Sequence, residues 1–333
     1  MQSAWVSRWI EVHPAVAPGR GRFNAAPVRL FSEGLGDPAQ PVVLLVMGAM
    51  NQGIVWPEAF CEEIASAGFC VVRYDHRDTG QSQVGPYALQ PYDVDDLTAD
   101  ALAVAQAWAG PRRVHWIGMS MGGTLAQLAA LGQADKHMAA RVASLTLIMS
   151  TPDLSVPARA STGTPQYPPS DLPPPAPAYL EHMGRASREF AHTPQATLDK
   201  LVDGWRAANG NAAGFDSIAT RALVQRTLAR TSQPLAALNH VAASLSARDL
   251  SAALARLRVP TLIVHGADDP LVPPAHGAAL ARLIPGAVLL EVPEMGHMFD
   301  ARHLAQVTPR VIMHLQNALR VSYESLLSET RLP

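Results

Sequence analysis

The sequence is poor in cysteine and in charge. Only Cys61 and Cys70 occur among its 333 residues, and 16% of the residues are charged. The spacing of the two cysteines matches no metal-binding or redox motif, so we predict that both are buried in the core without a disulfide. The net charge of −2 leaves no global basic field, which argues against a nucleic-acid partner.

Long apolar runs are also missing from the sequence. No stretch approaches the roughly 20 apolar residues that span a bilayer, and residues 1–10 do not carry the apolar stretch of a secretory signal. We therefore predict no membrane partner and a cytoplasmic location. Hydrophobic residues still make up 48% of the chain, which is enough to bury a large core.

The sequence does contain a regular alternation of short apolar runs with helical patterns. This alternation is typical of a mostly parallel sheet covered by helices on both faces, an α/β fold whose first part we expect to be antiparallel. The expected strands cover residues 6–12, 28–31, 42–47, 69–74, 114–117, 144–149 and 260–265. The expected helices cover residues 57–67, 95–109, 178–190, 194–208, 216–229, 234–245 and 302–320.

The alternation stops near residue 150, where a proline-rich segment begins. Proline at this density cannot continue a helix or a central strand, and helical patterns without an intervening strand follow it. We predict a helical cap at residues 151–249, inserted into an α/β core made of residues 1–150 and 250–333. A separate helical domain behind a linker is the alternative, which the return to strand and helix after residue 260 disfavours.

The segment 113–130 joins a predicted strand to a predicted helix through the pattern G-x-S-x-G. In this context the pattern indicates a nucleophile elbow, a strained turn that presents a serine at the end of a sheet. Gly118 and Gly122 would let the strand and helix backbones pass closely, and Ser120 is the candidate nucleophile. A glycine-rich helix start with a capping serine is the alternative.

A serine hydroxyl needs a general base, and the base needs an acceptor that orients it. An aspartate and a histidine follow two later strands, in the chain order Ser, Asp, His, which differs from the orders of the chymotrypsin and subtilisin folds. Pro270 biases the residue before it toward an extended conformation, so we choose Asp269 over Asp268 as the acid, and His297 as the base. Either aspartate could instead satisfy the backbone of its own loop.

Acyl transfer also requires N–H donors for the oxyanion of the tetrahedral intermediate. We expect the backbone amides of Met121, directly after the candidate nucleophile, and of Ala49, in the loop 47–53, to serve as these donors. A plain glycine turn is the alternative for that loop. Methionines on the segments that should meet here favour a hydrophobic substrate pocket, although core packing explains them equally well. The pocket residues that we predict are Gly48, Met50, Met119 and Met298.

Six short segments carry a resemblance to a known family: M-G at residues 47–48, W-P at 56–57, R-Y-D-H-R-D-T-G-Q-S at 73–82, G-M-S-M-G at 118–122, D-P at 269–270 and G-H at 296–297. Together they resemble the α/β-hydrolase superfamily, and most closely its aclacinomycin methylesterase-like enzymes. The resemblance implies the α/β-hydrolase fold with a helical cap, a triad of Ser120, Asp269 and His297, and oxyanion donors at Ala49 and Met121. The second glycine of the family's M-G-G opening is Ala49 here, which keeps a backbone donor. The cap region matches poorly, so the family's substrate is not carried over.

We therefore predict a serine hydrolase that cleaves a carboxylic ester of a small, largely apolar molecule through an acyl-enzyme. A thioesterase, C–C hydrolase, perhydrolase or acyltransferase would use the same triad, and a catalytically silent binding protein is a further alternative. Serine at the elbow argues against haloalkane dehalogenase and epoxide hydrolase chemistry, which uses aspartate there. We expect no cofactor and no metal site, a structural role for the loop 75–82, and packing or loop-bonding roles for His115 and His265. The other histidines, His240 among them, show no metal-ligand spacing, and the oligomeric state is left open.

Overall fold

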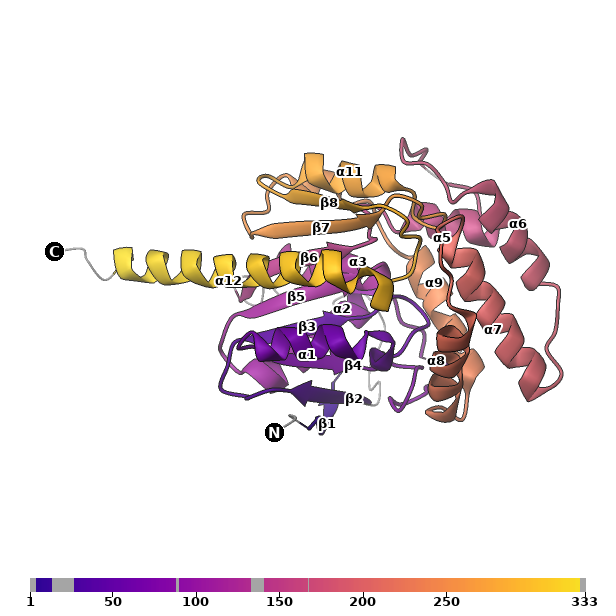
Figure 1. The fold of residues 1–333 in the computed structure, drawn as a ribbon, viewed down its shortest axis with the longest axis horizontal. Helices are drawn as coiled ribbons and strands as arrows, with labels where there is room; N and C mark the ends of the chain where they lie inside the picture. The colour runs from indigo at the N-terminus through magenta and orange to yellow at the C-terminus, as the bar shows by residue number, and fades with distance from the viewer. Residues whose placement is uncertain (1–3, 14–26, 88–89, 133–140, 167, 330–333) are drawn as a thin grey trace.

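The computed structural model describes residues 4–13, 27–87, 90–132, 141–166 and 168–329. Eight strands in these ranges form one sheet in the order β1-β2-β4-β3-β5-β6-β7-β8 (Figure 1). The strands are β1 (Val6–Val12), β2 (Val28–Leu35), β3 (Val42–Val46), β4 (Cys70–Tyr74), β5 (Val114–Met119), β6 (Val142–Ile148), β7 (Thr261–Gly266) and β8 (Val288–Val292). β2 pairs antiparallel with β1 and β4, and all the other neighbouring pairs are parallel.

Helices cover both faces of this sheet. On one face lie α1 (Glu58–Ser66) and α12 (Leu304–Glu329), and on the other lie α2 (Val94–Ala109), α3 (Met121–Ala130) and α11 (Pro274–Leu283). Two short 3-10 helices, η1 (Gly53–Val55) and η3 (Ala301–His303), lead toward α1 and α12. Successive side chains of a strand point to opposite faces, so Val43 and Leu45 of β3 pack with α1 and α12, whereas Leu44 and Val46 pack with α2 and α3. Every residue of β3 is buried, as a central parallel strand requires.

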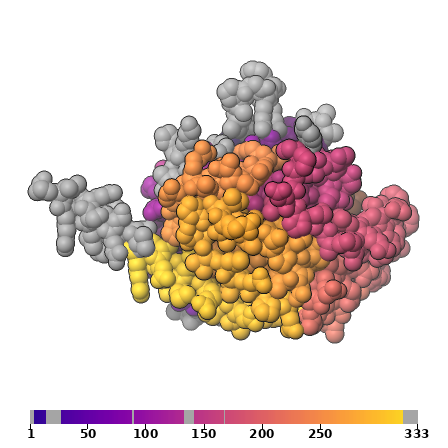
Figure 2. Space-filling view, turned by 90° about the horizontal axis from the view of Figure 1, so that it is seen from above, coloured from indigo at the N-terminus to yellow at the C-terminus, as the bar shows by residue number. Residues whose placement is uncertain are grey.

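The described chain between β6 and β7 contains helices and no strand. These helices are α5 (Ser155–Thr162), α6 (Pro177–Ala186), α7 (Pro194–Asn209), α8 (Ser217–Ala229), η2 (Pro234–Leu238), α9 (Asn239–Leu245) and α10 (Ser251–Leu254). We call α5 to α9 the inserted helices. Figure 1 shows them gathered at one end of the sheet. In Figure 2 the magenta surface of their first part adjoins the orange surface of the chain around and after β7. A hydrogen bond of 2.7 Å from the Ala176 amide to the Pro270 carbonyl also joins the inserted segment to the turn after β7.

Two sequence expectations about local structure are wrong. The proline-rich segment does contain a helix, α5, because Pro157 lies in its first turn, where a backbone N–H would have no acceptor within the helix. The strand expected to end at residue 31 continues to Leu35 through Gly34, which pairs with Val72 of β4. A Cβ on Gly34 would lie 2.4 Å from the Trp108 ring, so the packing of α2 on the sheet requires glycine at this position.

The expectation for the cysteines is confirmed, since Cys61 of α1 and Cys70 of β4 are buried free thiols. Burial raises the pKa of the Cys61 thiol to about 12, which keeps it protonated and unreactive. Among the described residues, none of the helices combines the length and the apolar character needed to cross a membrane.

Candidate active site

Ser120 occupies the turn between β5 and α3. Its backbone has φ 53° and ψ −121°, a conformation that L-residues other than glycine rarely adopt. The turn is held in this state from several sides: the Ser120 amide donates to the Ile148 carbonyl at 2.9 Å, and the Ser120 carbonyl accepts from the Ser150 hydroxyl at 2.9 Å. A strained residue that its surroundings hold in place is typical of functional sites.

The two glycines of the G-x-S-x-G pattern are required by close backbone contacts. A Cβ on Gly118 would lie 2.3 Å from the Gly122 carbonyl oxygen, and a Cβ on Gly122 would lie 2.1 Å from the Val46 carbonyl oxygen. Neither contact can be relieved by a side chain that moves. The turn at Ser120 therefore depends on both glycines, which is the close strand-to-helix passage of a nucleophile elbow.

Asp269 and His297 form a hydrogen-bonded pair at the ends of β7 and β8. His297 Nδ1 donates to Asp269 Oδ2 at 2.7 Å, and the Asp269 side chain is fully buried. The second carboxylate oxygen, Oδ1, accepts from the amides of Leu271 at 2.9 Å and Val272 at 2.8 Å. Asp268 is exposed, so of the two candidate aspartates the structure brings Asp269 to the histidine.

Inserted helix α7 supports the segment that carries His297. The His297 amide donates to the Ala208 carbonyl at 2.8 Å. A Cβ on the preceding Gly296 would lie 2.3 Å from the Asn209 carbonyl oxygen. Within the described ranges no hydrogen bond joins Ser120 Oγ to His297, a contact that in such sites commonly tightens only when substrate binds.

Of the two amides expected to bind an oxyanion, one directly follows Ser120 and the other is on a loop that contacts it. Met121 begins α3, and Ala49 follows Gly48 in the loop after β3. A Cβ on Gly48 would lie 3.2 Å from Ser120 Cβ, so this loop is in contact with the serine. In the described chain neither the Ala49 nor the Met121 amide donates to a protein acceptor. Both amides are therefore available to a negatively charged oxygen near Ser120.

The four residues predicted for a substrate pocket lie in different surroundings in the described chain. Met298 lines a cavity of about 370 Å³ with Trp56, Trp205 and the apolar side chains of Ala219 and Leu223 of α8. Met50, which is 42% exposed, lines a smaller cavity of about 90 Å³ that Trp205 also borders. Met119 is buried, and Gly48 packs against the serine as described above. Trp205 of α7 therefore borders both cavities, of which the one beside Met298 is the more apolar.

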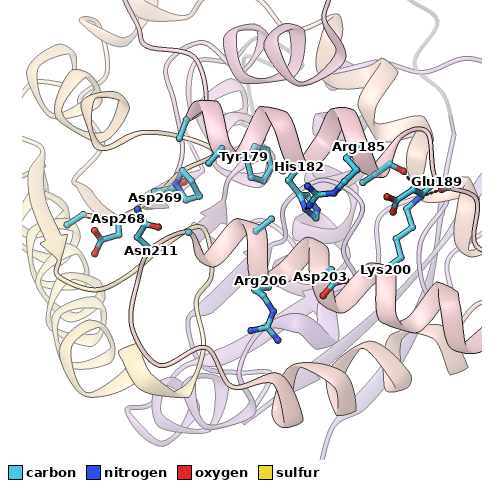
Figure 3. A pocket seen from close by; sticks show the side chains of 17 residues that line it. Tyr179, His182, Arg185, Glu189, Lys200, Asp203, Arg206, Asn211, Asp268 and Asp269 are labelled. Atoms are coloured by element: carbon cyan, nitrogen blue, oxygen red, sulfur yellow. Dashed lines mark hydrogen bonds between the residues drawn. The ribbon is translucent and has the colours of Figure 1, made fainter.

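A larger and more polar cleft of about 680 Å³ lies between α6, α7 and the turn after β7. Figure 3 shows Asp268 and Asp269 at one end of this cleft and Glu189 and Lys200 at the other. The Lys200 ammonium group donates to the carbonyls of Ala186 at 2.7 Å and Glu189 at 2.6 Å, so it caps the end of α6. No local sequence pattern predicts this cleft, because α6 and α7 meet only in the folded chain.

The loop after β4 has charged side chains that bind neighbouring segments. Asp75 Oδ1 accepts from the Gly53 amide at 2.8 Å, and Asp75 Oδ2 accepts from Arg230 of the inserted segment at 2.7 Å. Arg77 binds Asp100 of α2 through two hydrogen bonds of 2.6 Å. The loop thus connects the sheet, α2 and the inserted helices.

Three buried histidines make hydrogen bonds to neighbouring groups. Of the two expected to pack or bond loops, His115 Nδ1 lies 2.8 Å from the Ser144 hydroxyl, and His265 Nε2 donates to the Val272 carbonyl at 2.7 Å. The third, His240, was singled out only for its lack of metal spacing, yet it contacts the loop of Ala49, with Nδ1 2.9 Å from the Met50 amide nitrogen. The described residues contain no group of three side chains able to hold a metal ion.

Comparison with known proteins gives consistent matches. A family model of the alpha/beta hydrolase fold matches residues 41–300. The chain is 37% identical over 280 residues to rhodomycin D methylesterase DnrP of Streptomyces peucetius. The aligned region covers 81% of this chain and 89% of that protein. Rhodomycin D methylesterase DauP of Streptomyces sp. (strain C5) is 38% identical over the same length and coverage.

Similarity to solved structures extends over nearly the whole chain. The bromoperoxidase from Bacillus anthracis has a TM-score of 0.68 at 20% identity, covering 93% of this chain and 100% of that one. At this level of identity the similarity concerns the fold alone.

Proposed function

Since the chain belongs to the α/β-hydrolase fold family and is a hydrolase, we propose that it cleaves carboxylic esters of small, largely apolar molecules through Ser120, His297 and Asp269. The observation that carries this proposal is a combination of two features. Ser120 lies strained at the β5–α3 turn, and the hydrogen-bonded pair of buried Asp269 and His297 follows the neighbouring strands β7 and β8. Strain at the turn exposes the nucleophile, and the pair supplies an oriented base.

The hydrogen bond to Asp269 determines which nitrogen of His297 does the chemistry. Because Nδ1–H donates a hydrogen bond to the carboxylate, Nδ1 carries the proton of the neutral imidazole. The free lone pair is then on Nε2, which can take the Ser120 proton. The serine oxygen then bonds to the ester carbonyl carbon, and the oxyanion is held by the Ala49 and Met121 amides. Collapse breaks the carbon–oxygen bond to the alcohol, which leaves with the proton from His297. Water, activated by the same histidine, releases the acid from the acyl-enzyme.

We assign the substrate class from the relatives and the cavities. The two methylesterase relatives favour a methyl ester as the bond that is cleaved. We propose that residues 151–249 act as a cap over the site, and that the apolar cavity beside Met298, Trp56 and Trp205 takes the apolar body of the substrate. Burial of such a body removes apolar surface from water, which favours binding.

The test is the mass of the intact protein after reaction with a fluorophosphonate. We expect one adduct on the wild type and no adduct on Ser120→Ala, whereas Ser187→Ala, which changes an exposed serine after α6, should react like the wild type. The turnover of the methyl, ethyl and aryl esters and of a thioester of one acid would then show which of these bonds is cleaved fastest. Wild-type turnover by folded Ser120→Ala, or absence of an adduct on the folded wild type, would contradict the proposal.

A further inference from the structure

Inserted helix α9 contacts the loop that carries Ala49. The fully buried His240 lies between this loop and the loop after β4. Its Nδ1 accepts the Met50 amide at 2.9 Å, and its Nε2 donates to the Arg77 carbonyl at 2.9 Å. These two partners require the neutral imidazole with its proton on Nε2, because an amide N–H needs an acceptor. Burial, with a smaller contribution from His76, lowers the pKa of His240 to about 3 and keeps this form at neutral pH.

The Met50 amide belongs to the peptide group that follows Ala49. The carbonyl of the same peptide group accepts from Asn51 Nδ2 at 3.0 Å, so the group is held at both its N–H and its C=O. Met50 itself has φ 65°, which a methionine keeps only where its surroundings hold it. The Ala49 N–H is on the adjoining peptide group, and its direction depends on the same backbone torsions.

A second residue of α9 contacts the other half of the proposed oxyanion hole. Ser244 lies one helical turn after His240, on the same face of α9. Its hydroxyl is 3.7 Å from the sulfur of Met121, and both side chains are buried. One face of an inserted helix therefore contacts both segments that carry the proposed donor amides.

We propose that His240 is a positioning residue that holds the Ala49 amide in place, so that α9 completes the oxyanion hole. The inference rests on the proposed function, because it requires an oxyanion to develop beside this loop. His240 does not touch the reacting atoms and acts through the Met50 peptide group. Because the hole binds a charge that develops only in the transition state, loss of this support should lower kcat and leave KM nearly unchanged.

Two substitutions separate the hydrogen bonds that His240 makes. In His240→Asn the side-chain oxygen lies where Nδ1 was and can still accept the Met50 amide. In His240→Gln the side-chain nitrogen can reach the Arg77 carbonyl, but the acceptor for Met50 is lost. With p-nitrophenyl acetate as substrate, we expect kcat of His240→Gln to fall at least about tenfold, short of the 10²- to 10³-fold that follows loss of a donor itself. We expect His240→Asn to stay within about threefold of the wild type.

His276→Gln provides the matched control. His276 is also fully buried and also ties the inserted segment to the sheet domain, with Nε2 donating to the Pro173 carbonyl at 2.8 Å, but it contacts neither donor loop. If His240 only docks the insertion, both glutamine variants should lose thermal stability and share the same kcat. A kcat loss confined to His240→Gln, at unchanged KM, supports the positioning role.

Several results would overturn the inference. Equal kcat in the two glutamine variants would do so, as would a tenfold loss in folded His240→Asn, which decides the question if His240→Gln does not fold. Ser120→Ala separates this failure from failure of the proposed function. If Ser120→Ala is inactive and His240→Gln keeps its kcat, the serine hydrolase stands and only the role of His240 is lost. If Ser120→Ala stays active, the proposed function itself fails.

Discussion

Replacing Asp269 with asparagine should disable the base while leaving the fold intact. Asp269 Oδ1 accepts two backbone amides, from Leu271 and Val272, and Oδ2 accepts the His297 Nδ1 proton. An asparagine must keep its oxygen on the two amides, because turning its NH2 group toward them would set donors against donors. The NH2 group then faces His297 Nδ1, which has to become the acceptor. The proton of the imidazole moves to Nε2, and the nitrogen that should take the Ser120 proton no longer has a lone pair.

The size of the effect follows from the loss of the correct tautomer. A wrongly protonated histidine in an otherwise intact triad costs about 10⁴-fold in kcat. At about 1.4 kcal/mol for each factor of ten, this corresponds to roughly 5 kcal/mol of transition-state stabilisation. The folded protein keeps both bonds from Leu271 and Val272 to the side chain, so the unfolding temperature of Asp269→Asn should stay close to that of the wild type.

The assay is kcat for a methyl ester, with thermal unfolding followed on the same samples. Asp268→Asn is the control, because it makes the same chemical change at the neighbouring, exposed position. We expect the control to keep kcat within about threefold, which would tie the loss to the hydrogen bond and not to the charge of the turn. The reasoning is refuted if folded Asp269→Asn keeps a tenth or more of wild-type kcat, or if Asp268→Asn loses as much.

Three further predictions concern stability. Gly122→Ala should prevent native folding, because its Cβ would lie 2.1 Å from a backbone carbonyl of β3. Gly204→Ala, at an open position of α7, should instead stabilise the protein by about 0.5–1 kcal/mol. Circular dichroism and thermal melts of both variants test this pair. Arg230→Met should lower the free energy of unfolding by about 3 kcal/mol, because the buried Asp75 carboxylate keeps its backbone donors but loses its counter-charge. This corresponds to about 4 °C in unfolding temperature, and an unchanged melt would refute it. Burial lowers the pKa of His115 to about 3, so the folded state binds fewer protons than the unfolded state below the ordinary pKa of about 6.5, and stability must fall as the pH drops from there toward 3. At pH 5 this histidine should lower the free energy of unfolding by about 2 kcal/mol. His115→Gln lacks this titration, so between pH 7 and pH 5 its free energy of unfolding should fall by about 2 kcal/mol less than that of the wild type.

The parts of the molecule that depend on neighbours in sequence were predictable. The strand before Ser120, the turn and α3 form one continuous segment, whose glycines and periodicity indicate their own conformation. The choice between Asp268 and Asp269 also came from a local effect, the restriction that Pro270 places on the residue before it. The structure brings Asp269 to His297, across 28 positions of sequence.

The parts that depend on distant contacts were not predictable. His240 lies 190 positions from Met50, and nothing in the residues around it differs from an ordinary helix. The strand predicted over residues 28–31 continues through Gly34 because of packing against the ring of Trp108, which lies on another element. The cleft between α6, α7 and the turn after β7 was not predictable either, because no local sequence pattern indicates it.

The contacts of α9 with the loop of Ala49 and with Met121 bear on how this enzyme could acquire new substrates. Exchanging the whole insertion for that of a relative would keep Ser120, Asp269 and His297. It would nevertheless remove the contacts of His240 with the Met50 amide and of Ser244 with the Met121 sulfur. A chimaera of this kind should bind its new ligand and turn it over slowly. Stepwise change at Leu223 of α8, which lines the apolar cavity and makes neither of these contacts, would alter the ligand without that penalty. The insertion therefore acts as two evolutionary units, one open to variation and one tied to the chemistry of the sheet.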